Sequence, residues 1–251
     1  MKNSASSTIR QSILALCLCF LSSCAYIEPL VSDVNMISVP DERILGGKLA
    51  QQVLSQMKIV RDGEAAKTID AIGQKLVTKL PYREFDYHFY VVADKTPNAF
   101  TIPGGHIFIH TGLFSMTENK HEIAGVLAHE IGHAFERHPT KGLTRAYGIN
   151  YLAGLVLDKN AGTLRTLSIR ITETGILTRY GRQDEIEADH LGFNLLKQSG
   201  YSPDGLLNFL VKIQRLQRDP GLLQLLSSHP PTTERIETLK ALQSRDASRP
   251  L

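Results

Sequence analysis

Apolar residues along most of this chain recur every three or four positions, with polar residues between them. This period is typical of amphipathic α-helices that bury one face. Proline-containing turns mark where two of the later periodic segments begin. The pattern predicts helices in these ranges: Arg43–Val60, Ala65–Leu80, a segment around 123–134, Arg182–Gly200, 204–218, and a last one that follows Pro231 and runs through Leu242.

Two short segments follow a different period, in which side chains alternate between two faces. Asp86–Ala93 (DYHFYVVA) is rich in aromatic and β-branched residues, and HIFIH alternates strictly after a Pro-Gly-Gly turn. We therefore predict a small β-sheet. His106 and His110 share one face of HIFIH and suggest a metal site. Any half-buried strand shows the same alternation, so we favour a structural role for both.

The length suits one domain with its own core, and the predicted fold class is α+β, predominantly helical. Gly148–Leu157 is apolar and Leu164–Leu177 is mixed, but neither reaches the roughly 18 residues of a membrane-spanning helix. We therefore expect a soluble domain. A short apolar helix resting on a membrane surface is the alternative left open.

The N-terminus has the features of a secretory signal. Lys2 and Arg10 are followed by the apolar stretch Ile13–Leu21, and Leu21 to Cys24 reads LSSC, which resembles a bacterial lipobox. The apolar stretch is too short to span a bilayer. We predict that residues 1–23 are a lipoprotein signal peptide that is removed, with Cys24 lipidated. Residues 24–42 would form the lipidated tether and residues 43–251 the domain.

Cysteine usage and charge exclude two classes of function. Cys17 and Cys19 lie in the predicted signal, so Cys24 is the sole mature cysteine, and neither an intrachain disulfide nor a thiol mechanism is available. Removing the signal leaves 26 Lys and Arg against 25 Asp and Glu, so the formal charge falls from +3 to +1. This balance indicates no polybasic surface, and we expect no nucleic-acid partner.

The stretch AHEIGHAFERHP, residues 128–139, contains a candidate metal site. A helix turns about 100° per residue, so His129 and His133 lie one turn apart on the same face. In the pattern H-E-x-x-H, two such histidines bind Zn²⁺ and the adjacent glutamate, here Glu130, acts as general base. The alternative is an ordinary helix with solvated histidines.

A catalytic zinc needs a third protein ligand. His138 follows His133 by five residues, about 140° around a continued helix, so we expect a surface or helix-capping histidine. His121 lies upstream and is also expected to be solvated. The third ligand must therefore come from another segment.

Acidic residues of the predicted helix Arg182–Gly200 are candidates for that ligand. Glu185 and Asp189 share a stripe with Ala188 and Gly192, whose small size would allow a close approach to the first helix. Buried carboxylates need partners, and a metal would supply one. The other acidic residues of this stretch are expected to be exposed: Asp184 and Glu187.

Taken together, these motifs resemble those of a known peptidase family. HEIGH is followed by Y-x-R-x-x-E-x-E-A-D-x-x-G (Tyr180–Gly192) and then by SHPPTTERI (Ser228–Ile236). This order is similar to the zinc metallopeptidases of the CAAX prenyl protease and HtpX family, and within it to the soluble periplasmic BepA- and LoiP-like lipoprotein branch. NAFTIPGGHIFIHTGLF (Asn98–Phe114) is similar to the family's strand and turn before the zinc helix. The similarity covers about Leu45–Leu239. Gly181 departs from the family's usual serine, which puts one local hydrogen bond in doubt.

The resemblance implies a zincin-like, gluzincin domain in which the small sheet lies beside the zinc-binding helix. It implies one Zn²⁺ per chain, held by His129, His133 and Glu185, with Asp189 supporting a ligand histidine. An edge strand beside the zinc would pair with an extended peptide. The residues implied for that strand are Asn98, Ala99 and Phe100.

His229, in SSHPP before the last helix, has two interpretations of equal weight. It is either a loop or helix-capping histidine, or a functional residue. In the family it resembles, the corresponding histidine approaches the zinc as a switch. A histidine that stands nearby could instead stabilise the oxyanion.

The predicted activity is zinc-dependent endopeptidase cleavage of misfolded or misassembled cell-envelope proteins, a substrate class implied by resemblance and location alone. The alternative is a chaperone-like outer-membrane assembly factor with a latent or structural zinc site. Lipoprotein sorting favours the periplasmic face of the outer membrane, or the cell surface in a single-membrane bacterium. The expected partners are therefore such substrate proteins and a membrane, reached through the lipid anchor.

Overall fold

The computed structural model describes residues 35, 37–157, 161–174, 177 and 179–248. The predicted signal, Cys24 and most of the predicted tether lie outside the described residues. The folded unit begins at Ile37, and helix α2 (Val39–Gln56) starts four residues before the predicted Arg43. Ser38 caps it by accepting a hydrogen bond from the Asp41 backbone N–H. The last residues assigned to the tether, 37–42, therefore belong to the folded unit.

A four-stranded sheet has the order β1-β2-β4-β3. Its strands are β1 (Ile59–Val60), β2 (His88–Val92), β3 (Ala99–Ile102) and β4 (His106–His110). β2 and β4 are parallel, and the other two pairs are antiparallel. Gly104 and Gly105 adopt positive φ angles of 80° and 85° in the β3–β4 turn, a conformation that glycine takes without strain. β3 is thus an edge strand among the described strands.

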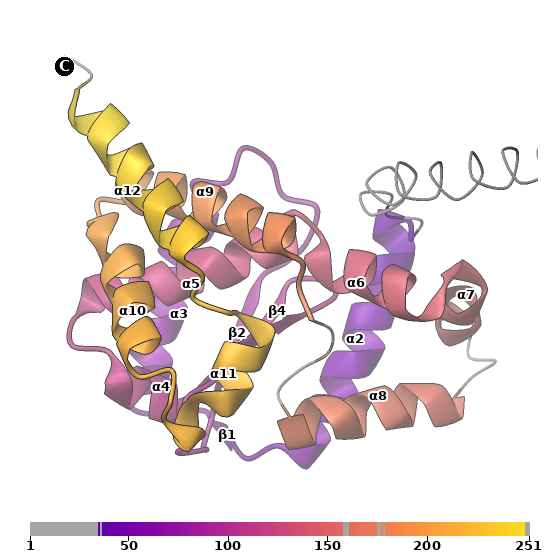
Figure 1. Ribbon diagram of the computed structural model, residues 1–251. Helices are drawn as coiled ribbons and strands as arrows, with labels where there is room; N and C mark the ends of the chain where they lie inside the picture. Colours follow the sequence, from indigo (N-terminus) through magenta and orange to yellow (C-terminus); the bar gives the residue numbers. More distant parts are fainter. Residues whose placement is uncertain (1–34, 36, 158–160, 175–176, 178, 249–251) are drawn as a thin grey trace, which may run out of the picture. The chain divides into compact units, whose positions relative to one another are not determined.

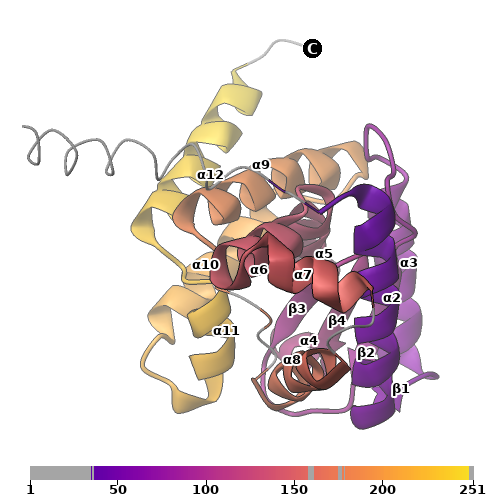
Figure 2. The ribbon, with the colours of Figure 1, turned by 90° about the vertical axis from the view of Figure 1, so that its right-hand side faces the viewer.

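Helices lie on both sides of this sheet (Figures 1 and 2). Alternation along the strands divides the hydrophobic core between its two faces. Ile107 and Ile109 of β4 join a cluster with residues of α3 (Glu64–Val77) and α5 (Lys120–Phe135). Phe108, between them, joins a second cluster with α2, α6 (His138–Tyr147), α7 (Ile149–Val156) and α8 (Ala161–Thr174). A strand buried on both faces reads as apolar throughout, as β4 does between its two histidines.

The observed elements confirm the predicted α+β, mostly helical fold. The helices not yet given are α4 (Thr111–Met116), α9 (Arg182–Gln198), α10 (Asp204–Arg215), the 3₁₀ turn η1 (Pro220–Leu222), α11 (Leu223–Ser228) and α12 (Thr233–Ala247). The predicted first helix was too long, because Ile59 and Val60 pair with β2 instead. Among the described residues, the helices are all too short or too polar to cross a bilayer.

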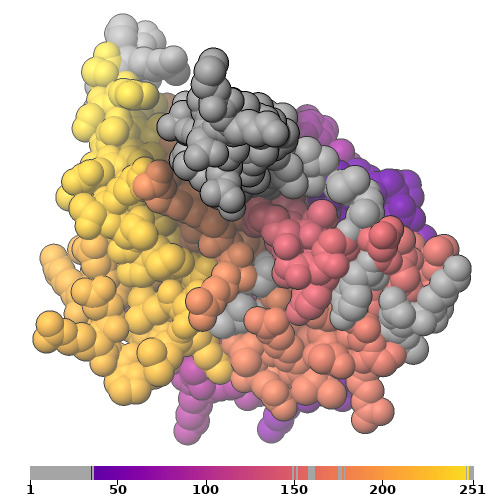
Figure 3. Space-filling view, turned by 45° about the vertical axis from the view of Figure 1, so that its right-hand side comes forward, coloured from indigo at the N-terminus to yellow at the C-terminus, as the bar shows by residue number. Residues whose placement is uncertain are grey.

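Helix α5 lies at the centre of the unit and packs most extensively against α9 and α10. Small residues allow the α5–α9 approach, as the sequence predicted. A Cβ on Gly132 would lie 2.8 Å from both Cα and O of Ala188, and one on Gly192 would lie 3.3 Å from the Ala128 carbonyl carbon. Figure 3 shows a face of the molecule on which the yellow C-terminal helices lie beside the orange segment that includes α9.

This contact predicts opposite effects for two Gly→Ala substitutions. Gly132→Ala places a methyl group against the α9 backbone and should lower the free energy of unfolding by about 1–3 kcal/mol, as overpacking does. Gly47→Ala is the matched control, because a Cβ at this exposed position of α2 would meet nothing within 4 Å beyond its own helix. It should raise stability by about 0.5–1 kcal/mol, the usual gain for alanine in a helix. Urea unfolding measures both, and equal stability of the two variants would contradict the close contact.

Candidate metal centre

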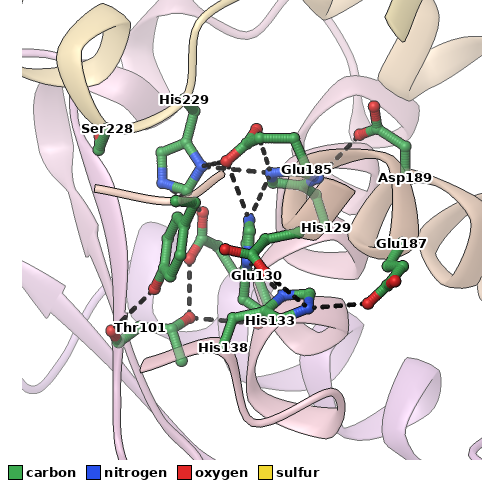
Figure 4. Close-up of polar contacts among 12 residues, drawn as sticks. Thr101, His129, Glu130, His133, His138, Glu185, Glu187, Asp189, Ser228 and His229 are labelled. Atoms are coloured by element: carbon green, nitrogen blue, oxygen red, sulfur yellow. Dashed lines mark hydrogen bonds and ion pairs between the residues drawn. The ribbon is translucent and has the colours of Figure 1, made fainter. Parts of the chain in front are cut away.

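Two helices bring together the predicted metal ligands. His129 and His133 come from α5 and Glu185 from the first turn of α9 (Figure 4). The two histidine Nε2 atoms lie 3.0 Å apart, His133 Nε2 lies 3.4 Å from Glu185 Oε1, and His129 Nε2 lies 3.5 Å from Glu185 Oε2. With His229, these side chains offer donor atoms within 4.8 Å of one another, and all are buried. One ion could contact all of them.

The donor atoms of this cluster fit a bound metal ion. Glu185 Oε2 and His229 Nε2 are buried and make no hydrogen bond, although Glu185 Oε2 has an ion-pair contact with Arg235. Buried polar atoms are rarely left in this state, and a cation held among the ligands would satisfy Glu185 Oε2. Two imidazoles and a carboxylate are also the donor set of many catalytic metal sites.

Electrostatics differ between the two histidines. Burial, reinforced by neighbouring His129, lowers the pKa of His133 well below its ordinary value and keeps it neutral, the form that binds metals. Burial and Arg235 also act to lower the pKa of His129, but Asp189 and Glu185 outweigh them and raise it to about 9. A metal at His129 must therefore displace a proton.

Asp189 lies beside His129, as the resemblance implied. Its Oδ1 is 2.9 Å from His129 Nδ1, on the opposite side of the ring from Nε2. Arg235 of α12, which is 1% exposed, donates two hydrogen bonds of 2.7 Å to Asp189 and contacts Glu185 at 2.5 Å. Burial alone would raise the pKa of both carboxyls, but Arg235 lowers that of Asp189 below its ordinary value and, with His229, that of Glu185 well below it.

Arg235 was not singled out from the sequence, although it lies within the SHPPTTERI motif. Its role in the fold follows from charge. Two buried carboxylates beside two histidines need a buried cation to offset the cost of their desolvation. A charged residue inside a recognisable motif was the available signal.

The prediction that His138 points away from the site was wrong. His138 is fully buried, and its Nδ1 lies 2.9 Å from His133 Nδ1. The helical extrapolation failed because α5 ends at Phe135 and Arg137 adopts the left-handed conformation, with φ 59°. This turn starts α6 in a new direction and returns His138 to His133.

Three other polar residues also differ from expectation. Glu187, expected to be exposed, lies 3.2 Å from His138 Nε2, and the His138 hydrogen bond lowers its pKa to about 2 despite partial burial. Asp184 is buried, accepts from the Gly181 backbone N–H at 2.8 Å and pairs with Arg145. His121 is half-buried, and its Nδ1 accepts a hydrogen bond from the Ser202 backbone N–H.

Glu130 lies beside the cluster but is held by the sheet. The Thr101 hydroxyl of β3 donates a hydrogen bond of 2.7 Å to Glu130 Oε2 (Figure 4). Tyr180, just before α9, stacks on the His133 ring at 3.9 Å between centroids. Its hydroxyl donates a long hydrogen bond, 3.4 Å, to the Thr101 carbonyl. Thr101 and Tyr180 were not singled out from the sequence, although both lie within motifs that resemble the family's.

The backbone N–H and C=O groups of the predicted edge-strand residues point in two directions, toward β4 or away from it. The His110 N–H donates to the Asn98 carbonyl, so Asn98 and Phe100 direct their backbone groups to β4. In an antiparallel ladder the intervening Ala99 and Thr101 then direct theirs outward. Of the three residues predicted for this edge, only Ala99 therefore directs its backbone groups away from β4, and Ala99 is fully buried.

His229 follows α11 and is 3% exposed. Its Nδ1 lies 3.1 Å from Glu185 Oε1 and 3.3 Å from His129 Nε2, and its Nε2 lies 3.5 Å from Glu130 Oε1. The ring therefore stands between the predicted ligands and the predicted base. His106 and His110 contact other groups: His106 Nδ1 lies 3.2 Å from the Tyr90 hydroxyl, and His110 Nδ1 lies 3.1 Å from the Thr96 carbonyl oxygen.

Comparison with known proteins agrees with this geometry. Among curated relatives, the beta-barrel assembly-enhancing protease of Yersinia pestis is 29% identical over 189 residues, which cover 70% of this chain and 38% of that protein. The Escherichia coli metalloprotease YcaL is 29% identical over 221 residues, covering 86% and 83%. The mitochondrial metalloendopeptidase OMA1 of Saccharomyces cerevisiae is 30% identical over 190 residues, covering 73% and 52%.

The chain thus spans about two fifths of the length of the beta-barrel assembly-enhancing proteases that it matches. The family model named peptidase family M48 matches residues 64–243, which include every residue of the cluster. The chain therefore belongs to peptidase family M48.

Proposed function

We propose that this protein is a zinc-dependent endopeptidase, with one zinc ion held by His129, His133 and Glu185. The proposal rests on one observation. Two imidazoles and the Glu185 carboxylate converge on one point, and a second carboxylate, Glu130, lies beside them. Nitrogen and carboxylate donors in this number favour zinc, and a site with three protein ligands leaves a position for water or substrate.

The residues of this chain would divide the chemistry of peptide hydrolysis. A bound zinc would supply Lewis acidity, which polarises the scissile carbonyl and makes water more acidic. Glu130 would accept the proton of the attacking water and pass it to the leaving amine. The Thr101 hydroxyl, 2.7 Å from Glu130 Oε2, would hold the carboxylate in place for both transfers.

We propose that the substrate is an extended segment paired with β3. The outward backbone groups of Ala99 and Thr101 would form the sequence-tolerant hydrogen bonds of an added strand. Thr101 places this edge next to Glu130. Ala99 and Thr101 are both buried in this conformation, so a substrate strand would first have to uncover this edge and displace the Tyr180 hydroxyl from the Thr101 carbonyl. This mode suits unfolded chains, whose backbone is free to pair.

The proposed substrates are misfolded or misassembled envelope proteins. Support comes from relatives named for beta-barrel assembly and from the predicted secretory signal and lipobox-like stretch of this sequence. Lipidation at Cys24 would anchor the enzyme to a membrane, with the periplasmic face of the outer membrane favoured. The same features suit the alternative, a chaperone-like assembly factor. In that alternative the metal site is latent, and the His229 ring, which lies against the ligands in this conformation, supports it.

Glu130→Gln should separate the two functions. With the general base removed, cleavage of an unfolded protein substrate should fall about 10²–10⁴-fold, while zinc content and substrate binding are retained. Glu136→Gln, at the C-terminal end of α5, is the matched control and should cleave normally. Chelation should abolish wild-type cleavage and added zinc should restore it. If the wild type binds the substrate but never cleaves it with zinc present, the assembly-factor alternative replaces the endopeptidase.

His229→Ala tests the position of the histidine among the ligands. If the ring blocks the site and the open state is about 10% populated, the substitution should raise kcat/KM about tenfold. His190→Ala, at an exposed position of α9, is the control. Loss of activity at unchanged zinc content would instead assign His229 to oxyanion stabilisation.

A further inference from the structure

A chain of hydrogen-bonding groups leads away from the metal-facing side of His133. His133 Nδ1 lies 2.9 Å from His138 Nδ1, and His138 Nε2 lies 3.2 Å from Glu187 Oε2 (Figure 4). Both imidazoles are fully buried, whereas the Glu187 side chain is 31% exposed. The chain therefore runs from the candidate metal centre to the protein surface and ends on a charge.

The charge at the end of this chain determines the proton positions along it. A carboxylate only accepts hydrogen bonds, so His138 donates from Nε2–H to Glu187. With its proton on Nε2, His138 can accept at Nδ1 from Nδ1–H of His133. His133 is left with its lone pair on Nε2, the atom that faces His129 and Glu185. This is the tautomer that a metal ligand requires.

With a metal bound at its Nε2, His129 would take the same tautomer by a shorter route. Its Nδ1 lies 2.9 Å from Asp189 Oδ1, so that carboxylate accepts its proton directly. Glu187 follows Glu185 by two residues, about 200° around α9, so it cannot lie on the face that meets α5. His138 bridges this gap. It is not itself placed to join the ligands, because it contacts His133 on the Nδ1 side of the ring.

We propose that His138 and Glu187 are positioning residues that hold His133 as the Nδ1–H tautomer and fix its ring for metal binding. This inference rests on the proposed zinc site. Support of this kind for a ligand histidine is worth about 10–100-fold in metal affinity.

Zinc affinity, measured by competition with a chromogenic chelator, tests the proposal without any assay of cleavage. His138→Leu removes the acceptor and should weaken zinc binding about 10–100-fold. His138→Gln offers a side-chain oxygen in its place and should recover most of that loss. His110→Leu, a change of another buried histidine at the end of β4, should leave the affinity unchanged.

Glu187→Ala keeps the proposal testable if His138→Leu does not fold, because Glu187 is partly exposed and truncating it leaves the core intact. It should weaken zinc binding about tenfold. The ¹⁵N chemical shifts of His133 in the zinc-free protein provide a second readout. They should report the Nδ1–H tautomer in the wild type and a mixture of tautomers in Glu187→Ala.

Two results would overturn the positioning role. One is a folded Glu187→Ala or His138→Leu protein that binds zinc as tightly as the wild type. The other is equal loss in His138→Gln and His138→Leu, which would mean that His138 contributes packing alone. A wild-type protein that does not bind zinc would instead contradict the proposed function, so the two failures are distinguishable.

Discussion

The close contact between α5 and α9 is the constraint on which the rest of the structure depends. Gly132 and Gly192 each meet the backbone of the other helix, so the two axes approach closely. Only at this separation does a glutamate side chain from α9 reach two imidazoles on α5. Larger residues at the crossing would push the two helices apart and would separate the ligands.

That contact also concentrates charge in the interior, and the fold compensates for it. Glu185 and Asp189 enter the core on α9, and Arg235 enters from α12 to meet both. A buried ion cluster of this kind adds little net stability, but removing one member leaves the others unpaired. The last helix is therefore tied to the metal centre by electrostatics, which explains why a motif so far along the chain belongs to the site.

Helical periodicity and ligand chemistry predicted much of this fold and site. The spacing of His129 and His133 predicted their shared face, and the stripe containing Glu185 predicted a close second helix. Composition and strand alternation predicted β2 and β4, and the family resemblance implied the edge strand β3. β1 was not predicted, because its two residues are too few to show a period.

The remaining features depend on backbone turns and on partners distant in sequence. His138 was misplaced because a left-handed residue that is not glycine, Arg137, ends the helix without a sequence signal. Arg235 and Tyr180 show their contacts only once the chain has folded. Periodicity describes one element at a time, so it does not predict which side chains meet between elements.

The left-handed turn at Arg137 has a mechanical consequence. The Arg137 guanidinium pairs with Glu42 at 2.7 Å and donates a hydrogen bond to the Ile37 carbonyl. It therefore binds the point where the folded unit begins. The next residue is His138, in contact with His133. A force applied to the chain before Ile37 would therefore act first on these contacts of Arg137, rather than along the length of α2. They lie directly beside His138, which contacts an imidazole of the metal centre.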